Sequence, residues 1–288
     1  METSLTLARQ FRLVCLLYGT LLATVSADEK HKQMPFSVEL GEPFTFDGVP
    51  PLQAFAHAHA DVDGTKWLFV TGRHNGLHGF SEPTPEDPEN DLAVKQANQH
   101  FWVIDIENRK VWKSPLAAVK HLMTDPLRGS NCLHCQVGDK LYVVGGYGAS
   151  AASRTTGNMT TFNSLTRIDV SQVVSAVINK SSWGQHVLQT YDDALRVTGG
   201  GMLPLDGDLI IVFGQVFDGL YSPAVGQSSG VFFQQYTRQI RRVKVSDHVR
   251  LDASVQNYPD YTLGQPQPND PSDPYRRRPV PGTCKPAS

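Results

Sequence analysis

Apolar and polar residues alternate along three similar stretches of this chain, and each stretch contains an apolar run that ends at a glycine. The stretches are residues 64–72 (GTKWLFVTG), 138–146 (GDKLYVVGG) and 207–214 (GDLIIVFG). Their starts lie 74 and 69 residues apart. Self-similarity at such a spacing is typical of a repeat protein such as a β-propeller, whose minimal blade has about 40–50 residues. Each unit is therefore expected to carry long loop insertions.

The order of elements is the same in the three units: an alternating strand, a Gly/Asp turn, a stronger apolar strand, a variable loop and further strands. The apolar positions show no sustained period of 3.6 residues, so we expect very little helix and an all-β fold. The predicted strands are 53–60, 66–71, 101–106 and 110–113 in the first unit, 165–170 and 171–177 as the third and fourth of the second, and 239–245 and 248–251 as the third and fourth of the last.

The two ends of the chain differ in composition from the units. Arg9 and Arg12 precede an apolar run at 13–25 and the small residues Val25, Ser26 and Ala27. This layout is typical of a secretory signal peptide cleaved after Ala27, and the run is shorter than the roughly 20 residues that span a bilayer. An uncleaved anchor is the alternative. At the other end, eight of the last thirty residues are proline, which predicts an irregular tail.

These boundaries predict how the chain is organised. The segments are a signal peptide at 1–27, a lead-in at 28–52, repeat units at 53–118, 131–180 and 194–251 within 53–258, and a tail at 259–288. We expect the mature chain to be secreted and not membrane-bound. The sequons at Asn158 and Asn179 predict N-glycosylation in a eukaryotic host. A net charge of −2 leaves no basic field for nucleic acid, so none is expected as a partner.

The apolar stretches resemble a known repeat family. Residues 141–147 (LYVVGGY), with the variants 67–72 (WLFVTG) and 209–214 (LIIVFG), look like the double-glycine core of Kelch repeats. Residues 72–78 (GRHNGLH), 197–200 (VTGG) and 217–221 (FDGLY) are similar to phrases of secreted Kelch-like proteins. The resemblance covers about 53–251 and implies a β-propeller of the kind found in the central domain of galactose oxidase. Thr71 and Phe213 stand where the first glycine of the pair is expected.

The number of units limits this expectation. Propellers usually close with four to eight blades, whereas about three are visible here. An unclosed propeller exposes a sheet edge, which promotes aggregation. The sequence therefore predicts an incomplete propeller, either part of a longer chain or a natural short form.

Candidate binding residues follow the core glycine of each unit. Equivalent loops of successive blades cluster on one rim, so these side chains are expected to converge into a polar and aromatic surface suited to a glycan or peptide. The alternative is that the Asn-Gly and Asp-Gly pairs only form turns and that the aromatic rings pack internally. The residues are Arg73, Asn75, His78, Tyr147, Gln215, Asp218 and Tyr221.

Four further motifs resemble metal, redox or catalytic sites, but a structural role explains each of them better. His57 and His59 lie on one face of a strand as a possible metal pair, but polar side chains are normal on the inner strand of a blade. Cys132 and Cys135 are too far apart along a strand, at roughly 10 Å, to form a disulfide with each other; one of them is a candidate partner for Cys284. Residues 226–230 (GQSSG) lack the strand-to-helix context of a nucleophile elbow, and the acidic segment 82–91 has no fixed rhythm of calcium ligands.

No cofactor, metal or catalytic residue is therefore expected. Kelch units mostly serve as binding scaffolds, and a minority occur in enzymes such as galactose oxidase and sialate epimerases, so the resemblance implies fold more than activity. The sequence favours a secreted, non-catalytic binding module for a protein or glycan. One alternative is an extracellular carbohydrate-active enzyme in which Arg73 grips a carboxylate and His78 transfers a proton. The other is a truncated chain without independent function.

Overall fold

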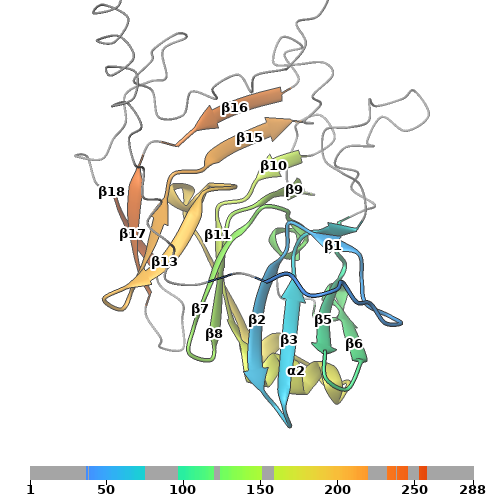
Figure 1. Ribbon diagram of the computed structural model, residues 1–288. Coiled ribbons are helices and arrows are strands. Elements are labelled where there is room, and N and C mark those ends of the chain that lie inside the picture. Colours follow the sequence, from blue (N-terminus) through green and yellow to red (C-terminus); the bar gives the residue numbers. More distant parts are fainter. Residues whose placement is uncertain are drawn as a thin grey trace, which may run out of the picture. The chain divides into compact units, whose positions relative to one another are not determined.

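Four antiparallel sheets of four strands each make up about half of the part of the chain that the structure describes (Figure 1). The computed structural model describes residues 37, 39–74, 97–119, 124–150, 159–219, 232–237, 239–245 and 253–257. The chain divides into two units, residues 1–44 and 45–288. The described residues of the first unit, 37 and 39–44, contain neither helix nor strand. All of the elements below belong to the second unit.

Three of the sheets are meanders, in which the strands are hydrogen-bonded in sequence order. The first meander contains β2 (Ala56–Asp61), β3 (Thr65–Val70), β5 (His100–Asp105) and β6 (Lys110–Pro115). The second contains β7 (Leu133–Val137), β8 (Lys140–Val144), β11 (Ser164–Asp169) and β12 (Val187–Tyr191). The third contains β13 (Gly201–Leu205), β14 (Asp208–Val212), β17 (Ile240–Val245) and β18 (Ala253–Asn257).

The fourth sheet, called the bridging sheet here, joins the second and third units of the sequence. Its strands, from edge to edge, are β16 (Phe232–Tyr236), β15 (Gln215–Gly219), β10 (Met159–Thr161) and β9 (Tyr147–Ala149). A two-stranded sheet pairs β1 (Leu52–Gln53) with β4 (Arg73–His74). The helices among the described residues are α2 (Val170–Ile178) and the 3₁₀ helices η2 (Leu116–Ala118), η3 (Pro126–Arg128), η5 (Gly184–His186) and η6 (Asp193–Leu195).

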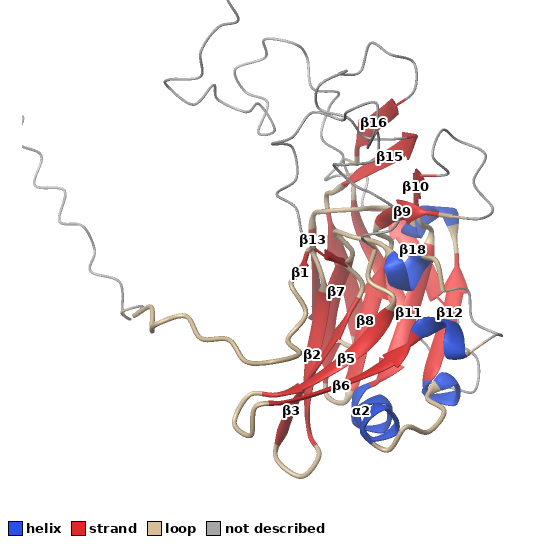
Figure 2. Cartoon of the chain, turned by 90° about the vertical axis from the view of Figure 1, so that its right-hand side faces the viewer, coloured by secondary structure: helices blue, strands red, loops and turns tan. Residues whose placement is uncertain are grey.

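The predicted all-β class is confirmed for the described residues, but the predicted strand at 171–177 is wrong. That segment forms the helix α2, which stands out among the strands in Figure 2. Val170, Val173, Val174 and Val177 are buried, and their spacing of i, i+3, i+4 and i+7 is the apolar stripe of a helix. The burial of each such side chain contributes about 1.5–3 kcal/mol, which outweighs the weak preference of valine for strands.

The helix displaces the fourth strand of the second unit. That strand is β12 (Val187–Tyr191), so the unit extends beyond the predicted limit of 180. In the third unit, β18 (Ala253–Asn257) is the fourth strand, and the predicted start at 248–251 lies outside the described residues. The signal peptide, residues 28–36 and 38 of the lead-in, and the tail at 259–288 also lie outside them.

Two apolar layers connect the meanders. One layer contains alternate residues of β2, among them Ala56, Ala58 and Ala60, together with residues of β8 and of α2. The other joins the second and third meanders, with Leu133, Leu165 and Ile211 among its buried members. Because side chains alternate along a strand, the second meander contributes to both layers.

Backbone conformation repeats at the end of the second strand in all three meanders. Two successive residues there have a positive φ, a region that L-residues rarely adopt. The repetition includes the two units in which threonine or phenylalanine replaces glycine at the first position. The pairs are Thr71–Gly72 (φ +62° and +79°), Gly145–Gly146 (+62° and +92°) and Phe213–Gly214 (+60° and +97°).

Thr71 is held in this conformation by its surroundings. Its side chain is fully buried, and its hydroxyl oxygen accepts a hydrogen bond from the backbone N–H of Ala56 at 2.9 Å. A β-branched residue at positive φ is strained unless neighbouring contacts determine its backbone. The glycine pair of the repeat is therefore a conformational requirement that other residues meet only at a cost.

Candidate functional site

Arg73, Tyr147 and Gln215 occupy equivalent positions in the three units. Each directly follows the two successive residues with positive φ, called the left-handed pair here. Each also forms an antiparallel bridge with a residue that precedes the first strand of its own meander. The bridges are Gln53 with Arg73, Ser130 with Tyr147, and Thr198 with Gln215. The equivalence that the sequence predicts for these three residues is therefore present in the backbone. Their role in binding a ligand stays a prediction.

The bridging sheet brings three of the predicted residues into one structure. Tyr147 lies in β9, while Gln215 and Asp218 lie in β15. Strands β10 and β15 pair at Thr160 and Asp218, and this pairing joins the hairpin that follows β8 to the hairpin that follows β14. Side chains also connect the hairpins: Gln234 donates to Gln215 at 2.8 Å within one of them, and Thr161 donates to the carbonyl oxygen of Phe217 at 2.9 Å between them.

The side chain of Tyr147 is packed internally. Only 2% of its surface is exposed, its hydroxyl group donates to the carbonyl oxygen of Gly219, and its ring meets that of Phe217 edge-on at 5.5 Å. This is the internal packing that the sequence left open as an alternative. Arg73 is also buried, at 5% exposure. Asn75, His78 and Tyr221 lie outside the described residues.

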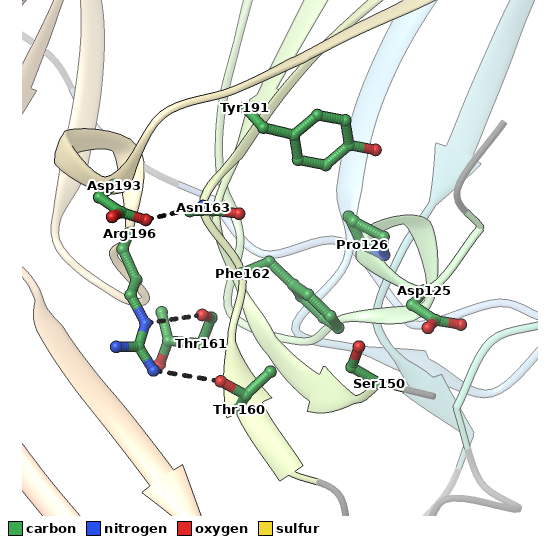
Figure 3. Close-up of a pocket in the computed structure, with 10 residues that line it drawn as sticks. All are labelled: Asp125, Pro126, Ser150, Thr160, Thr161, Phe162, Asn163, Tyr191, Asp193 and Arg196. Carbon is green, nitrogen blue, oxygen red and sulfur yellow. Dashed lines mark hydrogen bonds between the residues drawn. The ribbon is translucent and has the colours of Figure 1, made fainter. Parts of the chain in front are cut away.

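A cavity of about 330 Å³ opens beside the bridging sheet (Figure 3). Its residues come from the segment around η3, from the position after β9, from strand β10 and the turn after it, and from the end of β12 and the segment between β12 and β13. They are Asp125, Pro126, Ser150, Thr160, Thr161, Phe162, Asn163, Tyr191, Asp193 and Arg196. We call this the rim pocket. Three charged side chains, two aromatic rings and several hydroxyl groups make it suitable for a polar ligand with hydroxyl groups.

Arg196 organises one wall of the rim pocket. Its guanidinium group donates to the carbonyl oxygen of Thr161 at 3.1 Å and to the hydroxyl of Thr160 at 3.2 Å (Figure 3). It also forms an ion pair with Asp218 of β15, which accepts a second hydrogen bond from Thr160 at 2.9 Å. Arg196 thereby connects the segment before β13 to both hairpins of the bridging sheet.

Further polar groups lie at the edge of the pocket. Tyr191, the last residue of β12, is 41% exposed, and its pKa is raised first by burial and then by the carboxylate of Asp125. Its hydroxyl group donates a hydrogen bond to Oε1 of Gln189 at 3.1 Å. Asn163 donates its side-chain N–H to Asp193 at 2.9 Å, which fixes both groups at the edge of the pocket (Figure 3).

Among the predicted site residues, Asp218 has described side-chain contacts with residues that line the rim pocket, namely Arg196 and Thr160, although it does not line the pocket itself. Sequence reasoning missed Tyr191, Asn163, Asp193 and Arg196. These residues stand singly in separate turns and strand ends, so no local pattern marks them. The sequence segments 82–91 and 226–230 lie outside the described residues.

The two cysteines of the second unit are free thiols. Burial raises the pKa of Cys132 to about 12 and that of Cys135 to about 11. Cys132 also donates to the carbonyl oxygen of Gly145 at 3.5 Å. Cys284 lies outside the described residues. Within the described ranges, no group of three or more His, Cys, Asp or Glu side chains gathers in a way that could hold a metal ion.

No protein-family model matches the chain, and no curated protein matches it. Among the helices that the structure describes, none is long and apolar enough to cross a membrane.

Proposed function

We propose that the three meanders are blades of a Kelch-type β-propeller, which this chain forms in part. Three features support the proposal: the sequential order of four strands in each sheet, the left-handed pair that repeats after each second strand, and backbone hydrogen bonds that repeat from one unit to the next. The last are the bonds from Gly72 N–H to Gly129 O at 2.7 Å and from Gly146 N–H to Val197 O at 2.9 Å.

We further propose that the mature chain is secreted and acts as a non-catalytic binding module, whose ligand is a glycan bound in the rim pocket. The observation that carries this is the combination of the exposed ring of Tyr191 with the planar polar groups of Asn163 and Asp193. An aromatic ring covers the apolar face of a sugar, while amide and carboxylate groups bond to its hydroxyl groups. A protein ligand is the alternative within the same class.

A carbohydrate-active enzyme is supported less well. Glycoside hydrolysis needs a carboxylic acid and a carboxylate on either side of the scissile bond. Asp125 and Asp193 both line the rim pocket, but each already has a partner: Asp125 lies 3.8 Å from Arg128, and Asp193 accepts from Asn163. These contacts favour binding over proton transfer. Turnover of chromogenic glycosides by the purified chain would support the enzyme instead.

The binding proposal is tested on an array of immobilised glycans with the chain expressed through a secretory pathway. Tyr191→Ala and Asp193→Ala are expected to lower the affinity for a bound glycan by about tenfold or more, because each removes a contact in the pocket. Tyr236→Ala is the matched control, because Tyr236 has a similar exposure, 37%, and does not line the pocket. If the wild type binds no glycan, or if all three variants bind alike, the proposal is wrong.

A further inference from the structure

Two histidines from different meanders meet outside the rim pocket. His57 lies in β2 and His134 in β7, and these are the first strands of adjacent meanders. The Nδ1 atom of His57 and the Nε2 atom of His134 are 3.2 Å apart. Their ring centroids are 4.9 Å apart, and the ring planes are inclined by 69°.

This separation matches that of two ligands on one metal ion. Imidazole nitrogen atoms bind Zn²⁺ at about 2.0–2.1 Å, so two of them at a tetrahedral angle lie roughly 3.3 Å apart. We propose that His57 and His134 form a binding site for a divalent transition-metal ion, with Nδ1 of His57 and Nε2 of His134 as ligands and water at the remaining positions. Zn²⁺, Cu²⁺ and Ni²⁺ are the ions that imidazole suits.

The fold holds the two imidazole rings in place. Gln136, two residues after His134 on the same strand, bonds to both backbone groups of His59. Its Nε2 atom donates to the carbonyl oxygen at 2.7 Å, and its Oε1 atom accepts from the N–H at 3.0 Å. These two hydrogen bonds between one side chain and one backbone residue fix the position of β7 along β2. His134 is two residues before Gln136 on β7, and His57 is two residues before His59 on β2. The same register therefore places His134 opposite His57.

The surroundings of the pair are open to solvent on one side. In β2 the alanines are buried, whereas His57 and His59 are exposed. The rings of Phe55 and Trp67 lie near that of His57, each with its centroid at 6.1 Å.

The proposed metal site is independent of the rim pocket, because none of its residues lines that pocket. A metal ion here would also connect the first and second meanders through two side chains. The consequence is measurable without any glycan: binding should raise the melting temperature of the full chain, because the ion binds the folded state and not two separated histidines of the unfolded one.

The test uses the untagged full chain, treated with EDTA and dialysed, and titrated calorimetrically with ZnCl₂, NiCl₂ or CuCl₂. His57→Gln and His134→Gln are each expected to weaken the tightest site by about tenfold or more, since each leaves a single imidazole. His59→Gln is the matched control, because it removes a neighbouring exposed imidazole that is not in the pair. It is expected to leave the affinity within about twofold.

Two results would overturn the proposal. One is a wild type whose tightest site binds no better than that of the double variant His57→Gln, His134→Gln. The other is an equal loss in His59→Gln, which would assign binding to scattered surface histidines. Circular dichroism establishes that every variant is folded. The pair is confirmed as the site if metal raises the melting temperature of the wild type and of His59→Gln but not that of the other variants. Neither result depends on the glycan proposal.

Discussion

The backbone N–H of Asn131 donates a hydrogen bond to the carbonyl oxygen of Ala54 at 3.2 Å. The carbonyl oxygen of Asn131 in turn accepts one from the N–H of Gly199 at 2.9 Å. Ala54, Asn131 and Gly199 all have a positive φ, of +54°, +53° and +64°, and each stands two residues before the first strand of its meander. Successive units are thus joined by backbone groups at equivalent positions, which allows their side chains to differ.

Gly72 provides a test of this backbone repeat. A Cβ atom there would lie 2.6 Å from the carbonyl oxygen of Gln53 and 3.0 Å from the Cα atom of Phe55, and φ is +79°. Gly72→Ala should therefore lower the free energy of unfolding by about 2–3 kcal/mol or more, as the sum of about 1 kcal/mol for the left-handed conformation and the backbone clash. The measurement is urea denaturation followed by circular dichroism.

The matched control is Gly138→Ala. Gly138 has φ +57°, but a Cβ atom at this position would have no atom within 4 Å beyond its chain neighbours, so only the conformational cost of about 1 kcal/mol remains. Equal losses in the two variants would contradict the view that close contact with the segment before β2 requires glycine at position 72.

Regular elements can be predicted where the pattern is local. The strands that end just before Gly72 and Gly146 have continuous apolar runs bounded by turn residues, and these runs match the observed β3 and β8 to within a residue or two. The run at 170–178 is rich in valine, which favours strands, but its buried valines lie at helical spacing, and packing of this stripe against the first meander stabilises the helix. Tertiary burial overrides local propensity there.

The site depends on contacts that no local pattern encodes. Thr160 and Asp218, whose pairing joins the two halves of the bridging sheet, are 58 residues apart. Arg196 and Tyr191 are single polar residues in or beside short connections, so nothing in the sequence distinguishes them from other polar residues of the chain. Equivalence between repeats predicts the backbone positions of Tyr147 and Gln215 correctly but cannot show that Tyr147 is buried.

The thiols of Cys132 and Cys135 make a chemical prediction. Alkylation requires the thiolate. The pKa is about 12 for Cys132 and about 11 for Cys135, against an ordinary value of 9.0. At pH 8 the thiolate fraction is therefore lower by about a thousandfold for Cys132 and about a hundredfold for Cys135. Iodoacetamide should therefore leave both unmodified in the native chain and modify both in urea. Peptide mass mapping distinguishes them from Cys15 and Cys284, and rapid native labelling of Cys132 would contradict the burial of its thiol.

Asn179 offers a test of the secretory route. It caps the C-terminal end of α2 and is exposed, so its side chain is accessible to a glycosyltransferase. Expression in a eukaryotic secretory host should yield a chain whose mass falls on treatment with a glycosidase specific for N-linked glycans, and Asn179→Gln should remove that part of the shift. Ser181→Ala, which destroys the sequon but keeps Asn179, should have the same effect. A chain that carries no glycan at Asn179 would count against the proposed route.

Acid should destabilise the chain through Asp105. The backbone N–H of Asn108 donates to this carboxylate at 2.8 Å and is the main cause of a pKa lowered from 3.8 to about 2; the side chain of Asn108 and the ammonium group of Lys66, 3.0 Å away, add to it. Because the folded state binds the proton less tightly than the unfolded state, this stabilisation is present in full above about pH 4 and is lost as the pH falls toward 2.

Asp105→Asn should accordingly melt at a lower temperature than the wild type at pH 7, because Lys66 then loses the buried partner of its charge. The difference between the two proteins should shrink between pH 4 and pH 2, since the wild type loses the same interaction by protonation. Asp47→Asn is the control, because Asp47 is exposed, and it should change neither melting temperature nor its dependence on pH. Thermal melts in citrate and phosphate buffers of equal ionic strength measure both. A difference that stays constant down to pH 2 would mean that the Asp105 carboxylate does not contribute through its charge.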